Sequence, residues 1–492
     1  MPTLLLCLLI AASGEVRPTI AIAPPVSSAP QDAWVGLALA DTLGTRLLIH
    51  SRYDAKSLER IYPLNVFGWR QTLAAARGEG IDAARIDDTS AVVVARQLGA
   101  DAVFVGSYVV TGKDVALRWA LVGDRAKAGT LALTLDGIGP AAEALAAAIL
   151  QAIGQDARTA GGNKIEPLPI AAYKPFGEAL LLLGRQSLDP RAQLVLGEPE
   201  LRRAVALLSA ATDAGPSFVR AWVERGIAAA MLGDEKGAEE ALVQAMAQAG
   251  EFDPPTALGL YYLYDRQHKY DEAIAILRQA TDAHLGFLQG LGYLGEAYAR
   301  AGMQHESALV FTNYSARVPK SPWAALRRGA ALARLGKHDA AIADTEALLV
   351  RFPGSLAVLT ALASRQIDAG QLDLARATLQ KVLSQKPDLP AALTRLSYIE
   401  LEQNKAAIGL TLAERAVKAL GDGRGEPLAG YAHLNLGHAL ALLGRKDEAM
   451  AAFAKAATLG VGSEEMAYVL RDARLADILA DPRFPLALGH KR

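Results

Sequence analysis

Residues 291–302 read LGYLGEAYARAG, and this stretch sets the register for the second half of the chain. An apolar residue recurs every 34 residues from its first position, and a turn residue recurs at the same spacing from its last. The apolar anchors are Leu291, Ala325, Leu359 and Leu393, and the turn residues are Gly302, Gly336, Gly370 and Asn404. A fixed period of this length, with two helical stretches per unit, predicts helical hairpins. The hairpins must stack, because a single one cannot bury its apolar face.

The clearest unit also shows which family the array is similar to. It carries Leu294-Gly295-x-x-Tyr298, followed by Phe311 and Pro319. This pattern resembles the tetratricopeptide repeat, and the resemblance extends over residues 170–462 in about eight repeats. It implies an all-α solenoid that binds protein or peptide partners and performs no catalysis. Residues 463–492 depart from the pattern and are predicted to form a C-terminal cap over the last repeat.

Residues 17–154 have a different pattern, which predicts an α/β domain. Short β-branched or alternating runs predict strands, and the last three should form a meander. The predicted strands are Thr19–Ala23, Asp101–Val110, Val115–Val122 and Thr130–Leu135. The predicted helices are Trp34–His50, a helix opened by Asp87 and ending at Leu98, and Ala141–Ile153 with its start at Pro140. Residues 51–84 give no clear pattern, and residues 155–169, which contain Gly161-Gly162, are predicted to be a linker.

Three segments of this domain resemble the N-terminal domain of TolB-like proteins, which is often fused to tetratricopeptide repeats. They are Ile20-Ala21-Ile22-Ala23-Pro24, Ala95–Asp101 followed by Gly106-Ser107, and Leu121-Val122 with Gly129 further on. Gly123 departs from that family, because an acidic residue is usual there. The resemblance implies a non-catalytic binding domain in an envelope or signalling setting.

The first 13 residues are predicted to be a signal peptide. The apolar run Leu4–Ala12 is followed by the small residues of a cleavage site, although no Lys or Arg precedes it. The pattern favours export to the periplasm or secretion, and the alternative is a cytoplasmic protein in which residues 1–13 belong to the fold. Cys7 is the only cysteine, so the exported chain would contain no disulfide. No run reaches the ~18 apolar residues of a membrane-spanning helix, so envelope association would be peripheral.

The composition and motifs argue against several function classes. Lys and Arg number 51 and Asp and Glu 52, whereas nucleic-acid binding favours a clustered basic excess. Gly290-x-Gly292-x-x-Gly295 fits a dinucleotide fingerprint as a string, but it lies inside a predicted helix rather than after a strand. His433 and His438 are five residues apart, which places them on different faces of a helix. We therefore predict no catalytic residues, no metal and no cofactor.

The family resemblance places the first helix of each repeat along a concave groove. The residues it assigns to the groove are Arg220, Tyr262, Asp265, Glu296, Trp323, Tyr398, Tyr431 and His438. Aromatic residues with a few charges suit a peptide or protein segment, although individual aromatic residues could instead pack between helices. The leading hypothesis is an exported scaffold in bacterial envelope assembly or organisation. The alternative is a cytoplasmic regulatory or signalling adaptor.

Overall fold

The computed structural model describes residues 18–50, 64–78, 81–82, 85–124, 126–154, 167–184, 196–249, 253–284, 286–421, 427–459, 461, 466–481 and 484. These residues divide into two compact units. Unit 1 comprises the described residues up to Ala331, and unit 2 comprises those from Leu332 onward. The predicted signal peptide, residues 1–13, and most of the predicted linker, residues 155–166, lie outside the described residues.

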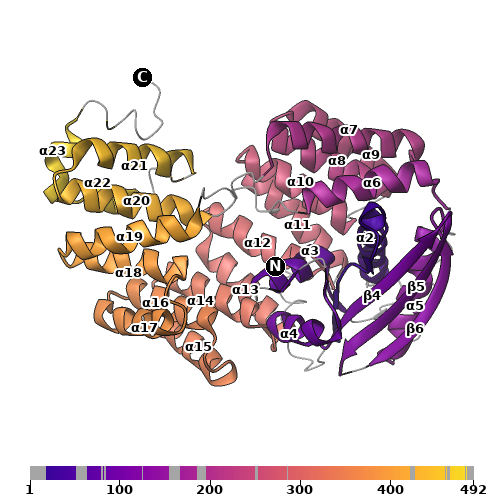
Figure 1. The fold of residues 1–492 in the computed structure, drawn as a ribbon, viewed down its shortest axis with the longest axis horizontal. Coiled ribbons are helices and arrows are strands. Elements are labelled where there is room, and N and C mark those ends of the chain that lie inside the picture. The colour runs from indigo at the N-terminus through magenta and orange to yellow at the C-terminus, as the bar shows by residue number, and fades with distance from the viewer. Residues whose placement is uncertain are drawn as a thin grey trace. The chain divides into compact units, whose positions relative to one another are not determined.

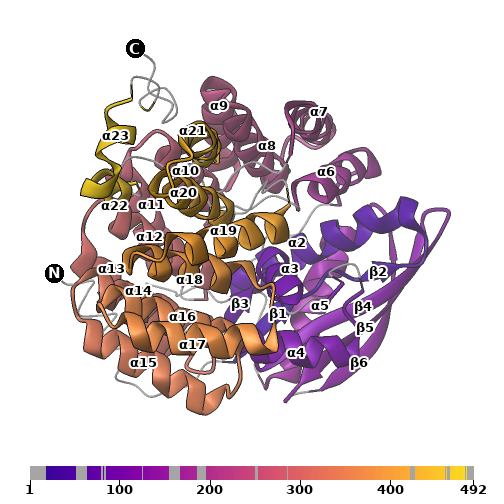
Figure 2. The same cartoon turned by 60° about the vertical axis from the view of Figure 1, so that its left-hand side comes forward.

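Unit 1 begins with a mixed β-sheet. Its strand order is β3 (Asn65–Phe67), β1 (Thr19–Ile22), β4 (Ala102–Thr111), β5 (Asp114–Gly123) and β6 (Lys127–Thr134), and β2 (Val26–Ser27) also pairs with β4. Strand β1 runs parallel to β3 and β4, whereas β4, β5 and β6 form an antiparallel meander (Figure 2). The α/β class predicted for this region is confirmed. Strand β3 lies within residues 51–84, for which no element was predicted.

Four helices and one short 3-10 turn pack around this sheet: η1 (Pro30–Asp32), α2 (Ala33–His50), α3 (Trp69–Gly78), α4 (Asp88–Leu98) and α5 (Ile138–Ala152). Helix α5 begins at Ile138, two residues before the predicted start at Pro140. The helix tolerates a proline in its first turn, because an amide there would have no hydrogen-bond partner within the helix. On one face of the sheet the rings of Phe104 and Trp119 stack at 6.2 Å. Gly129 lies opposite Trp119, and a Cβ there would lie 3.0 Å from the indole ring.

The remainder of the described chain is an array of paired helices. In unit 1 the pairs are α6 (Ile170–Leu183) with α7 (Glu198–Ala214), α8 (Val219–Leu232) with α9 (Glu235–Ala249), α10 (Pro254–Arg266) with α11 (Tyr270–Ala283), and α12 (Leu288–Arg300) with α13 (Gln304–Arg317). Helix α14 (Pro322–Arg334) crosses the boundary between the units. The predicted helical-hairpin solenoid is confirmed.

Unit 2 continues the same order with α15 (His338–Arg351), α16 (Leu356–Asp368), α17 (Leu372–Gln385), α18 (Pro390–Glu402), α19 (Ala406–Leu420), α20 (Pro427–Leu442) and α21 (Lys446–Thr458) (Figure 1). Short elements follow: α22 (Ala467–Leu470), η2 (Ala473–Leu475) and α23 (Ala476–Leu479). Val469, Ile478 and Phe484 from this end join the core under α21, where Phe484 meets Phe453 edge to face at 5.4 Å.

A left-handed residue ends the first helix of most repeats. The backbone φ at these positions lies between 58° and 81°, at Gly233, His268, Gly302, Gly336, Gly370, Asn404 and Gly444. This conformation is strained for most residues with a Cβ, and Gly and Asn tolerate it best. The structure therefore confirms the turns predicted from the 34-residue period and explains why asparagine can replace glycine at position 404.

Within a repeat, a small residue on the first helix faces a large one on the second. A Cβ added to Gly295 would lie 2.6 Å from the Phe311 ring, and one added to Gly437 would lie 2.7 Å from Phe453. These close approaches let the two helices of a hairpin pack tightly around a buried aromatic ring. The spacing of small and aromatic residues in the sequence is the direct cause of this packing.

Candidate partner-binding surface

The eight residues assigned to the groove are divided between the two units. Arg220, Tyr262, Asp265, Glu296 and Trp323 belong to unit 1, and Tyr398, Tyr431 and His438 belong to unit 2. All eight lie on first helices of repeats, namely α8, α10, α12, α14, α18 and α20. We call the surface formed by the first helices of all repeats in a unit, α16 (Leu356–Asp368) of unit 2 included, its first-helix face, and we describe the two faces separately.

Arg220 on the first-helix face of unit 1 is paired with the N-terminal domain. Its Nε donates to Oδ2 of Asp41 at 2.7 Å, and its Nη2 donates to Oδ1 of the same carboxylate at 2.7 Å. Asp41 lies on α2 and also accepts a hydrogen bond from Nε1 of Trp69 at 3.0 Å. This two-pronged geometry is the strongest form of arginine–carboxylate contact. The N-terminal domain thus holds a residue that the sequence assigned to partner binding.

Two more charges extend this contact into a network of alternating sign. Arg220 Nη2 donates to Glu224 Oε1 at 2.8 Å, and Arg70 Nη2 donates to Glu224 Oε2 at 2.7 Å. The side chains of Asp41 and Glu224 are 5% and 2% exposed, so water screens these charges little. Burial opposes ionisation of Asp41, but the guanidinium of Arg220 outweighs it and lowers the pKa of Asp41 below its ordinary value. The same carboxylate raises the pKa of Arg220 against the effect of burial.

Contacts with main-chain atoms bring the N-terminal domain against further repeats of unit 1. Helix α2 packs on α6, where a Cβ added to Gly177 would lie 2.5 Å from the Trp34 carbonyl oxygen (Figure 1). Asn65 Nδ2 donates to the Arg317 carbonyl oxygen at 3.2 Å, and the Val66 amide donates to that of Gly286 at 3.3 Å. The N-terminal domain therefore contacts residues from α6 to the end of α13 within unit 1.

The other groove residues of unit 1 differ in exposure. Tyr262 and Asp265 are 2% and 4% exposed, and Asp265 forms an ion pair with Arg300. Glu296 forms an ion pair with Arg327. Trp323 is 38% exposed, and the Arg327 guanidinium lies 4.8 Å from the centre of its ring. Trp323 is therefore the member of this set that offers the most surface to a partner.

The three groove residues of unit 2 also differ in exposure. Tyr431 is 42% exposed, Tyr398 is half-buried and His438 is fully buried. His438 Nε2 lies 2.8 Å from Oδ2 of Asp472. Burial lowers the pKa of His438 despite this carboxylate, whereas hydrogen bonds from Arg474 hold the pKa of Asp472 far below its usual range. We infer that His438 links the last repeat to the segment that follows it.

Two arginines of unit 2, Arg395 and Arg365, were not among the predicted residues. Arg395 on α18 reaches toward α16, where its Nε donates to Ser364 Oγ at 2.5 Å, and its Nη1 donates to the Ala391 carbonyl oxygen at 2.9 Å. Arg365, the next residue on α16, donates from Nη1 to Asp368 Oδ2 at 2.8 Å. The two arginines are 30 residues apart rather than 34, so the repeat period gave no signal for them.

Comparison with known families now agrees with this geometry. One family described as tetratricopeptide repeat matches residues 191–254, 258–322 and 394–463, and a second of the same description matches residues 323–355. This chain is a tetratricopeptide repeat protein. Neither matching family is catalytic, and a search of curated proteins finds no match.

Several solved structures are similar to the repeat array of this tetratricopeptide repeat protein. A tetratricopeptide repeat protein from Parabacteroides merdae is 20% identical, covers 52% of this chain and 98% of its own, and has a TM-score of 0.42. Yeast Tom70 is 15% identical, covers 68% of this chain and 70% of its own, and has a TM-score of 0.46. YrrB, a tetratricopeptide repeat protein with an unusual peptide-binding site, is 16% identical over 38% of this chain and 95% of its own, with a TM-score of 0.30.

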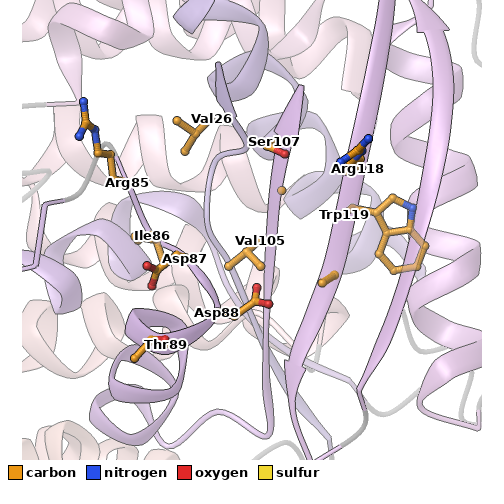
Figure 3. A pocket seen from close by; sticks show the side chains of 12 residues that line it. Val26, Arg85, Ile86, Asp87, Asp88, Thr89, Val105, Ser107, Arg118 and Trp119 are labelled. Carbon is orange, nitrogen blue, oxygen red and sulfur yellow. The ribbon is translucent and has the colours of Figure 1, made fainter. Parts of the chain in front are cut away.

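The α/β domain of this tetratricopeptide repeat protein also has an open hollow of about 590 Å³ (Figure 3). It lies between the start of α4 and strands β4 and β5, and its charged lining residues are Arg85, Asp87, Asp88 and Arg118. The Ser90 amide and hydroxyl lower the pKa of Asp87, because this carboxylate caps α4. Asp87 therefore has a structural role at the hollow.

Searches for two other features gave negative results in the described ranges. No group of three or more His, Cys, Asp or Glu side chains is arranged to hold a metal ion among the residues that the structure describes. No helix in the same ranges combines the length and apolar character needed to cross a bilayer.

Proposed function

We propose that this protein is a scaffold that binds a protein or peptide partner through the first-helix face of unit 2. The observation that carries the proposal is the accessible pair of aromatic side chains on the first-helix face of unit 2. In unit 1, Arg220 is bound to Asp41 of the protein's own N-terminal domain. In unit 2, the described residues include the exposed ring of Tyr431 and the half-buried ring of Tyr398. Amphipathic aromatic side chains of this kind are enriched where proteins bind partners.

The test is capture of partners from a cell extract by the full-length protein. We expect the combined change Tyr398→Ala and Tyr431→Ala to remove the partner that the unaltered protein retains. A matched control changes Val350 and Leu374 to Ala, because both are large, apolar and exposed but lie on second helices. Equal loss of the partner in both double variants, or in neither, would exclude the first-helix face of unit 2 as the binding surface.

The setting of this scaffold forms a finer part of the proposal. We favour an exported protein that acts in envelope assembly or organisation, with the α/β domain as a TolB-like docking module. The apolar run Leu4–Ala12 and the resemblance of residues 17–154 support this setting. The second candidate is a cytoplasmic regulatory or signalling adaptor, in which residues 1–13 belong to the fold. Sequencing the N-terminus of the protein isolated from cells separates them, because only export removes Met1 together with the residues after it.

A further inference from the structure

Arg395 is a half-buried cation whose partners in unit 2 are neutral. Its hydrogen bonds go to the Ser364 hydroxyl and the Ala391 carbonyl oxygen, at 2.5 Å and 2.9 Å. No carboxylate bonds to Arg395 in the part of the chain that the structure describes. A charge removed from water is usually paired with an opposite charge, because desolvation without pairing is costly. Arg395 therefore has no hydrogen-bonded anionic partner among the described residues.

The neighbouring arginines add to the uncompensated positive charge around Arg395. Arg395 donates to Ser364 on α16, and the charge of Arg365, the next residue on that helix, acts on Arg395. Burial and the nearby Arg365 both lower the pKa of Arg395, and burial and Arg334 both lower the pKa of Arg365. Asp368 is the carboxylate that offsets this repulsion, and it is already bound to Arg365. The three arginines on α14, α16 and α18 thus leave an excess of positive charge.

We propose that Arg395 and Arg365 form a binding site for a carboxylate group on an acidic side chain of the partner. This inference rests on the proposed function, because the site lies on the same first-helix face of unit 2. Arg395 Nη2 takes part in no hydrogen bond among the described residues, so its N–H groups are available to donate to an anion. A planar guanidinium with free donors matches the geometry of a carboxylate.

The position of Tyr398 indicates how the rest of the partner is held. Tyr398 is one helical turn from Arg395 on α18, so both side chains emerge from the same side of that helix. Its ring is half-buried, which leaves an apolar surface beside the cationic site. A segment with an aspartate or glutamate next to an apolar residue matches this pairing of charge and ring. We therefore infer an acidic segment that also carries apolar residues.

The test uses the full-length protein and two fluorescently labelled peptides. One peptide is rich in glutamate with an interspersed phenylalanine, and the other has each glutamate replaced by glutamine. We expect the first to bind at least about tenfold more tightly, because a hydrogen bond between charged groups is worth more than one between neutral groups. Arg395→Gln and Arg365→Gln should each remove most of this preference, whereas Lys381→Gln, which removes an exposed charge on α17, should retain it.

Thermal unfolding of the same variants shows that a loss of binding is not a loss of fold. Arg395→Gln removes an uncompensated buried charge, so its midpoint should stay level or rise. Equal binding of the two peptides, no binding of the acidic peptide, or an equal loss in Lys381→Gln would overturn the carboxylate site. Partner capture separates the two proposals. If the tyrosine double variant loses the partner but Arg395→Gln binds it as the unaltered protein does, the proposed function stands and the carboxylate site is wrong.

Discussion

Replacing Arg220 by methionine tests whether the buried charge network holds the N-terminal domain on the repeats of unit 1. The substitution keeps much of the side-chain length and removes the guanidinium that bridges Asp41 and Glu224. Glu224 keeps Arg70 as a partner, but Asp41 is left with the Trp69 indole. Removing one member of a buried ion pair costs about 3–5 kcal/mol. We expect the unfolding free energy of unit 1 to fall by that amount at neutral pH.

Urea unfolding followed by tryptophan fluorescence measures this loss directly. All five tryptophans of the chain precede Leu332, so their emission reports on unit 1. The double variant Asp41→Leu with Arg220→Met removes both charges of the pair. It should recover much of the loss, because apolar side chains of similar size often replace a buried ion pair at little cost.

The pH dependence gives a second, independent check. In the unaltered protein the pKa of Asp41 is lowered, so its contribution is present above the unfolded value of about 3.9 and is lost as pH falls below it. In Arg220→Met burial acts on Asp41 without that guanidinium, so the pKa of this carboxyl should rise. The loss of stability in Arg220→Met should then diminish as acid protonates the Asp41 carboxyl. The unfolding free energies of the two proteins should therefore converge from pH 7 towards pH 4. A difference below about 1 kcal/mol at pH 7, or one independent of pH, would refute this account of the network.

Three further predictions concern backbone shape, close packing and pH. Gly370→Ala should destabilise unit 2 by about 1–2 kcal/mol in calorimetry, because φ is +73° there. An added Cβ would meet no atom within 4 Å, so this cost is backbone strain and not a clash. Gly370→Asn should cost less, as Asn404 occupies the equivalent turn, and equal costs would contradict the strain argument. Gly177→Ala should lower the stability of unit 1 by about 1–3 kcal/mol in the urea assay, because the added Cβ meets the Trp34 carbonyl oxygen, and an unchanged midpoint would contradict that contact. The lowered pKa of His438 means that the unfolded chain binds its proton more readily, so unit 2 should lose stability as pH falls below about 6.5, and His438→Gln should flatten that slope in calorimetry across pH 5.5–7.5.

The repeat array could be predicted because its determinants are local and recur. The turn residue at Gly370 and the pairing of Gly295 with Phe311 each depend on contacts inside one hairpin, and the same spacing repeats along the chain. The meander of the N-terminal domain could also be predicted, since its strands follow one another through short turns. Strand β3 was missed because it has only three residues and its pairing with β1 crosses 46 positions, as Thr19 with Asn65 shows.

The candidate site was less predictable because its chemistry depends on distant pairs. Arg220 was placed on a partner-facing helix from its position in the repeat, yet its partner Asp41 is 179 residues earlier. Nothing in the local pattern around either residue indicates the other. Arg395 likewise shares its surroundings with Arg365 at a spacing that the repeat does not use. Sequence periodicity locates the helices, whereas the charge balance between them is visible only in three dimensions.

The contact between α2 and the first repeats has a practical consequence for fragments of this protein. A fragment that begins at Ile170 lacks both Asp41 and Arg70, and it presents Arg220 and Glu224 to solvent without those counter-ions. Used as bait in an interaction screen, this fragment would expose charged side chains that are buried in the intact protein. Interaction screens with it would recover ligands of an artificial face, so baits for this protein need the N-terminal domain in place.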